Sequence, residues 1–196
     1  MRVPWIKVCG ITSVRDARTV EAAGADAVGI VLSRGDPRSV RLDAAAEIAA
    51  AVTVEVVAVL RDRDLDLVRD VLLAVGPGRL QVEGGAPSAP PPLPWYRALE
   101  VRGRGELSDL AQAPGDRVLV RLDPALLPGG RLWSRDRTLL QEIGRAAAVV
   151  IGAPLVGIEA VCREVRPAGV DLREAVEREP GVLDSGRLEA AMRALR

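Results

Sequence analysis

A lysine and a cysteine two positions apart are the residues in this sequence that most directly suggest chemistry. Lys7 and Cys9 lie in a short apolar run, Ile6–Cys9, which is followed by Gly10. Because side chains alternate along a strand, Lys7 and Cys9 share one face. An ammonium group beside a thiol lowers the thiol pKa from its usual value of about 8.5, and a thiolate is a competent base or nucleophile. The pair predicts an activated thiol, although Cys9 as a small buried apolar residue is the alternative.

Two further side chains have the types needed for proton transfer or anion binding. Asp123 follows the apolar run Val118–Leu122, where its carboxyl group could act as an acid or only begin a turn with Pro124. Arg38 lies in a loop, and its guanidinium group could bind a carboxylate or a phosphate through two hydrogen bonds. The sequence contains no histidine. Acid–base chemistry must therefore come from Cys, Asp, Glu, Lys or Tyr.

These residues fall at or near the ends of short β-branched runs that alternate with Ala- and Leu-rich amphipathic stretches. Such alternation is typical of repeated βα units around a parallel sheet. The expected strands are Ile6–Cys9, Ala27–Leu32, Val54–Leu60, Leu80–Val82, Ala98–Val101, Val118–Leu122, Val149–Ile151 and Gly169–Leu172. The expected helices are Val14–Ala23 (capped by Ser13), Leu42–Ala51, Leu65–Leu73, Leu107–Ala111, Ser134–Arg145, Val156–Glu164 and Ser185–Leu195. The pattern predicts an α/β fold, a (β/α)8 TIM barrel, with a six-stranded doubly wound sheet as the alternative.

The segment between the fourth and fifth expected strands breaks this rhythm. Four of the five residues from Pro90 to Pro94 are proline, which cannot form the interior of a helix. We therefore expect a trimmed barrel whose helix is missing here or replaced by a Pro-rich loop. The chain of 196 residues is expected to form one domain, 1–196. A gap in the helix layer would expose barrel wall, which a homodimer could cover.

The loops after the seventh and eighth strands are where barrels of this kind usually bind phosphate. Here these loops read Gly152–Pro154 and Arg173–Ala175. Pro154 has no N–H group and Glu174 would repel a phosphate. The two loops therefore predict a poor phosphate cradle, to which Arg173 could add charge.

Charge and composition narrow the set of partners. The sequence has 27 basic and 27 acidic residues, so nucleic acid and anionic membranes are not expected as partners. It has neither an apolar run of about 18 residues nor the pattern of a signal segment, so we expect a cytoplasmic protein without a membrane span. Cys9 and Cys162 do not make a disulfide scaffold, and Cys162 is expected to be a buried structural residue.

The segment Ile6–Thr12 resembles the first-strand signature of the phosphoribosylanthranilate isomerase family. The similarity continues along the chain at Asp16–Ala17, Ala23–Gly29, Pro37–Val40, Gln81–Gly84, Leu122–Asp123, Gly129–Gly130, Trp133, Val170–Asp171, Val176–Glu177 and Pro180–Val182. The resemblance implies a barrel enzyme of tryptophan biosynthesis. It also implies an Amadori rearrangement, in which an N-aryl aminoaldose phosphate becomes an aminoketose without metal or cofactor.

The resemblance also implies roles for particular residues. Cys9 would be the general base that removes the C2 proton, and Asp123 the general acid that protonates the sugar-ring oxygen. Arg38 would hold the anthranilate carboxylate. Further substrate-binding residues are expected at Lys7, Gln81, Gly152, Asp171 and Arg173. The ligand would be an aryl aminosugar or a related aromatic acid.

Several positions depart from the family pattern. Glu83 stands where the family has histidine, Gly152-Ala153 replaces a glycine pair, and Arg173–Ala175 replaces Ser-Ser-Gly; the loop after Asp123 is also shortened. Three hypotheses remain open. The chain is an isomerase of the ordinary tryptophan pathway, a diverged relative that applies the same base and acid to another aryl substrate, such as an unphosphorylated one, or a non-catalytic binding barrel.

Overall fold

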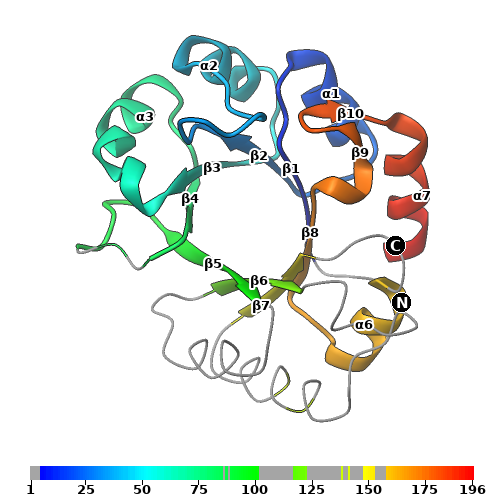
Figure 1. The fold of residues 1–196 in the computed structure, drawn as a ribbon. Coiled ribbons are helices and arrows are strands. Elements are labelled where there is room, and N and C mark those ends of the chain that lie inside the picture. Colours follow the sequence, from blue (N-terminus) through cyan, green and yellow to red (C-terminus); the bar gives the residue numbers. More distant parts are fainter. Residues whose placement is uncertain are drawn as a thin grey trace.

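The computed structural model describes residues 5–85, 87, 89–101, 117–122, 138, 141, 148–152 and 158–196. Its parallel strands form one closed barrel in the order β1 to β8. The strands are β1 (Ile6–Cys9), β2 (Ala27–Val31), β3 (Glu55–Arg61), β4 (Arg79–Glu83), β5 (Trp95–Val101), β6 (Arg117–Leu122), β7 (Ala148–Gly152) and β8 (Gly169–Leu172). Figure 1 shows the strands as a ring with the helices outside it. The predicted eight-stranded barrel is confirmed, and the doubly wound sheet is excluded because β8 pairs with β1.

The described helices lie close to their predicted positions. They are α1 (Val14–Ala22), α2 (Leu42–Ala50), α3 (Val68–Ala74), α6 (Ile158–Val165) and α7 (Ser185–Leu195). Ser13 caps α1 as expected, because its side chain accepts a hydrogen bond from the backbone N–H of Asp16 at 3.1 Å. The helix predicted at Leu65–Leu73 is partly wrong: a 3₁₀ helix, η1 (Asp62–Leu67), precedes α3 and has no side-chain cap.

The gap in the helix layer is also present. Among the described residues between β4 and β5, none is helical. Strand β5 begins at Trp95, directly after Pro94 and earlier than the predicted Ala98. Of the other two predicted helices, Leu107–Ala111 lies outside the described residues, and only Thr138 and Gln141 of Ser134–Arg145 are described, both as helical.

Alternation along the strands divides the core into two layers. Outward-facing residues such as Val8 and Ile30 pack with the helices in one large cluster. Inward-facing residues such as Val57, Tyr96 and Leu119 fill the barrel in another. Most of the strands have buried apolar residues on both faces, as expected for a parallel sheet covered by helices.

A small feature that the sequence pattern did not predict lies between β8 and α7. A short 3₁₀ helix, η4 (Glu174–Val176), leads into a hairpin of β9 (Glu177–Glu179) and β10 (Val182–Leu183). The hairpin carries Glu177 back toward the loop that contains Arg38. Among the helices that the structure describes, none has the length and apolar character to cross a membrane.

Candidate active site

A buried ion pair at the closure between β1 and β8 holds Lys7 inside the barrel. Parallel register places Lys7 beside Asp171, and its Nζ donates to Asp171 Oδ1 at 2.7 Å. Nζ also donates to Gln81 Oε1 at 2.9 Å, and Gln81 Oε1 accepts from the Tyr96 hydroxyl at 3.0 Å. Burial is the largest single influence on the pKa of Lys7 and acts to lower it, but the charge and hydrogen bond of Asp171, together with the charges of Cys9 and Tyr96, raise the pKa above its usual value. Lys7 is therefore a fixed cation.

The thiol of Cys9 lies next along the same inner face. Cys9 is 1% exposed and packs with Val31 and Val59; Cys9 and Val31 end their strands, and Val59 lies two residues before the end of β3. Its space is provided by Gly29, where an added Cβ atom would lie 2.8 Å from the Cys9 sulfur. Burial raises the pKa of Cys9, and the charge of Lys7 lowers it by less. The predicted lowering of the thiol pKa is therefore wrong, because burial outweighs the charge of Lys7 and the charge of Asp171 acts against that of Lys7.

A network of arginines and carboxylates spans the same end of the barrel. Glu83, at the end of β4, accepts at Oε1 from Arg121 Nη1 at 2.6 Å and from Arg173 Nη1 at 3.2 Å. Arg173 Nε also donates to Glu174 at 2.7 Å. Burial acts to raise the pKa of Glu83, but the charges of Arg121 and Arg173 lower it overall. Glu83 is therefore ionised and joins β4 to β6 and to the loop after β8.

Arg38 is held by the hairpin rather than left open to solvent. Its Nε donates to Glu177 Oε1 at 2.7 Å and its Nη2 to Glu177 Oε2 at 2.6 Å. Both side chains are largely buried, at 9% and 6% exposed. They fit against Gly10, which has a φ of +86° and where a Cβ atom would lie 2.9 Å from both side chains. The carboxylate of Glu177 thus fixes the direction of the guanidinium group.

The remaining predicted site residues fall at the same edge where they are described. Gly152 ends β7 and pairs in register with Asp171 and Arg121. Asp123 follows β6 directly in the sequence but lies outside the described residues. The structure thus brings Lys7, Gln81 and Asp171 together inside the barrel. Cys9 and Gly152 end β1 and β7, Arg173 follows β8, and Arg38 lies in a loop beside them.

Three residues of this network were not singled out from the sequence. Arg121 shares a face with Leu119 of the same strand, so strand alternation could have placed it inside the barrel. Tyr96 is the only tyrosine of the chain. Glu177 lies in a motif that was matched without a role. Within the described part of the chain, no cluster of Cys, Asp and Glu side chains is arranged to hold a metal ion.

Comparison with known proteins agrees with this geometry. A family model described as N-(5'-phosphoribosyl)anthranilate (PRA) isomerase matches residues 6–194. The N-(5'-phosphoribosyl)anthranilate isomerase of Stutzerimonas stutzeri is 32% identical over 206 residues, covering 100% of this chain and 99% of that protein. The phosphoribosylanthranilate isomerase structure from Thermus thermophilus has a TM-score of 0.80 at 28% identity, covering 100% and 98% of the two chains.

A third relative shows the fold with a ligand bound. It is a phosphoribosylanthranilate isomerase in complex with reduced 1-(o-carboxyphenylamino)-1-deoxyribulose 5-phosphate, with a TM-score of 0.82 at 21% identity, covering 100% of this chain and 98% of that chain. The family-model match and the full-length similarity confirm the resemblance of the motifs. The chain therefore belongs to the N-(5'-phosphoribosyl)anthranilate isomerase family.

Proposed function

We propose that this chain catalyses the Amadori rearrangement of N-(5'-phosphoribosyl)anthranilate in tryptophan biosynthesis, with Cys9 as the base. The observation that carries the proposal is the position of the Cys9 thiol. It lies inside the barrel at the C-terminal end of β1, near the Lys7–Asp171 pair, where (β/α)8 enzymes place their reacting groups. The ligand of the third relative is a reduced aminoketose phosphate, which matches the product type of this reaction.

The proposed chemistry moves protons within one substrate molecule. Asp123 gives a proton to the sugar-ring oxygen, and the ring opens to a protonated imine (iminium) between C1 and the aryl nitrogen. Cys9 as thiolate removes the C2 proton to give a neutral enaminol. C1 then takes a proton while the C2 hydroxyl gives one up, which leaves a carbonyl at C2. C2 is oxidised and C1 is reduced by the same electron pair, so the reaction uses no external oxidant or reductant.

Arg38 is the proposed ligand of the aryl carboxylate. Glu177 engages its Nε and Nη2, while its Nη1 has only a 3.9 Å ion pair to Asp36 among the described residues. A substrate carboxylate would therefore approach Nη1 of a guanidinium group whose orientation is already fixed. Pre-fixing the group reduces the entropy that substrate binding must overcome.

Two assays test the proposal together. The first is rescue of a tryptophan auxotroph that lacks this isomerase. The second is conversion of N-(5'-phosphoribosyl)anthranilate by the purified chain, followed by chromatographic separation of aminoaldose from aminoketose. We expect rescue and conversion, and absence of both would overturn the proposal.

A second candidate substrate is favoured by one observation. Glu83 and Glu174 both accept hydrogen bonds from arginines at the site, so they offset positive charge that a phosphate would need. A diverged enzyme that acts on the dephosphorylated aminosugar would have this property. A kcat/KM that is higher for the dephosphorylated substrate than for the phosphorylated one would favour this candidate.

A further inference from the structure

Glu83 occupies the position of a bound anion. Its Oε1 atom accepts hydrogen bonds from Arg121 Nη1 at 2.6 Å, from Arg173 Nη1 at 3.2 Å and from Gln81 Nε2 at 3.2 Å. The three donors come from β6, from the residue after β8 and from β4. Two guanidinium groups and an amide thus converge on one carboxylate oxygen. Proteins use the same arrangement to bind the oxyanion of a ligand.

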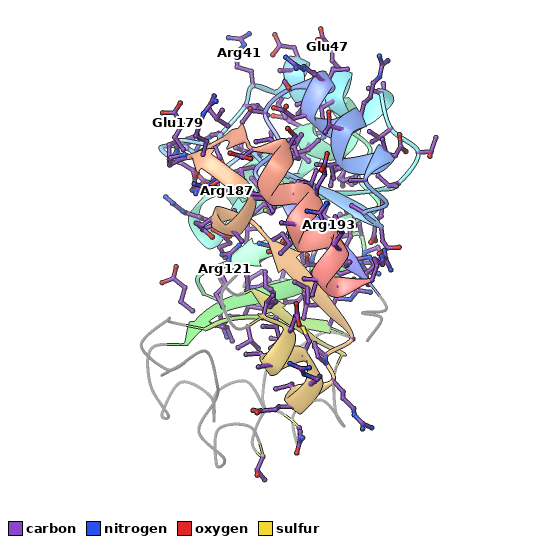
Figure 2. The ribbon with its side chains drawn as sticks, turned by 90° about the vertical axis from the view of Figure 1, so that its right-hand side faces the viewer. Arg41, Glu47, Arg121, Glu179, Arg187 and Arg193 are labelled. Carbon is purple, nitrogen blue, oxygen red and sulfur yellow. The ribbon has the colours of Figure 1, made fainter. Side chains whose placement is uncertain are left out.

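The two arginines lie where a barrel phosphate would bind. The side chain of Arg121 packs against Gly152, the last residue of β7: an added Cβ atom at Gly152 would lie 2.9 Å from Arg121 Cγ. Arg173 directly follows β8. Figure 2 shows Arg121 toward the same end of the barrel as Glu179 of the β9–β10 hairpin. The guanidinium groups therefore flank the ends of strands seven and eight, where the loops have poor backbone donors.

The site has a donor that Glu83 does not satisfy. Arg121 Nη2 is buried and has no hydrogen-bond partner among the described residues. Its nearest ion-pair partner is Asp171 Oδ2 at 3.6 Å, too far for a hydrogen bond, and Asp171 is already neutralised by Lys7. A ligand with several oxygens can use both nitrogens of Arg121, whereas Glu83 bonds to one of them.

The charges also fit a dianion better than a single carboxylate. Arg121 and Arg173 are 14% and 12% exposed, so their charges are poorly screened. Glu174 also contacts Arg173, but its side chain is 62% exposed and its contribution is weakened by solvent. Two guanidinium charges match the two negative charges of a phosphate, while Glu83 supplies only one.

We propose that Arg121 and Arg173 form a phosphate site that Glu83 fills as an internal counter-ion, and that substrate phosphate binds by displacing Glu83. The assignment of the anion as the substrate's phosphate rests on the proposed function. Glu83 is thus a specificity-determining residue: it sets the affinity of the site for phosphate through competition.

The test is calorimetric titration of the purified chain with inorganic phosphate, with sodium acetate as the comparison anion. The variants are Glu83→Gln, which keeps the shape and removes the charge, and the double variant Glu83→Gln/Arg121→Gln. The matched control is Glu55→Gln, which removes one carboxylate from an Arg79 contact at the opposite end of the barrel. Circular dichroism checks that each variant is folded, and Glu83→Gln/Arg173→Gln replaces the double variant if that one does not fold.

We expect Glu83→Gln to bind phosphate at least about tenfold more tightly than the unchanged chain. The gain should be absent for acetate, absent in Glu55→Gln and lost in the double variant. Equal phosphate affinity in Glu83→Gln and Glu55→Gln, or a gain that survives loss of Arg121, would overturn the inference. Binding is read without turnover, so this failure is distinct from failure of the proposed activity.

Discussion

Replacement of Lys7 by methionine should strongly destabilise the barrel. The change removes the ammonium group that donates to Asp171 at 2.7 Å and to Gln81 at 2.9 Å. Asp171 then remains as a carboxylate whose side chain is 1% exposed. Breaking a buried ion pair on one side costs about 3–5 kcal/mol. Because Arg121 Nη2 still lies 3.6 Å from Asp171, we expect the lower end, about 3 kcal/mol.

The assay is urea unfolding at neutral pH, followed by far-UV circular dichroism. The pKa of Lys7 is raised in the folded chain, so its contribution is complete below the unfolded value of about 10.4 and is lost only as pH rises through the higher folded value. A neutral-pH measurement therefore captures all of it. The matched control is Arg193→Met, which breaks an exposed pair with Glu189 and should change stability by less than about 0.5 kcal/mol.

A second variant separates the ion pair from simple packing. In the background of Lys7→Met, Asp171→Leu removes the unpaired carboxylate and should recover part of the lost stability. A loss below about 1 kcal/mol for Lys7→Met, similar to that of Arg193→Met, would refute the reasoning that Lys7 compensates a buried charge.

Three further outcomes follow from the site. Burial raises the pKa of Cys9, so the thiolate fraction, and with it kcat/KM, should keep rising from neutral pH to about pH 9. A plateau of the pH–rate profile already near pH 7 would contradict a raised thiol pKa. Gly29→Ala would place a methyl group 2.8 Å from the Cys9 sulfur, so kcat should fall by about 10² in steady-state assays, and an unchanged kcat would show that the thiol position is not critical. Glu177→Gln removes the charge that holds Arg38, so the free energy of unfolding should fall by about 3 kcal/mol and KM should rise. If both quantities are unchanged, the pair does not orient the guanidinium group.

Local patterns were enough to predict the strands and most of the described helices. Short apolar runs located β1 and β8, and the helix Ser185–Leu195 was predicted in full; the structure adds that Asp184 caps it. The start of β5 was missed because the prolines before Trp95 hid it. Alternation alone also placed Lys7 and Cys9 on one face, and their shared position inside the barrel is confirmed.

The pKa shifts and ion pairs of the site could not be predicted from local sequence patterns. Lys7 and Asp171 are 164 positions apart, and only the closure of β1 on β8 makes them partners. The sequence shows Lys7 as a lone cation beside a thiol, which predicts a lowered pKa. Pairing and burial reverse that effect, and both depend on the closed fold.

The most direct test of the account is the turnover of N-(5'-phosphoribosyl)anthranilate by Cys9→Ser beside Cys162→Ala. Cys162 is a suitable control because it is also buried, lies on α6 and has a pKa raised to about 12, mainly by burial. We predict that Cys9→Ser lowers kcat by at least about 10² with little change in unfolding free energy, while Cys162→Ala keeps most of its activity. A Cys9→Ser enzyme with more than about a tenth of the original kcat would contradict the assignment of Cys9 as the base.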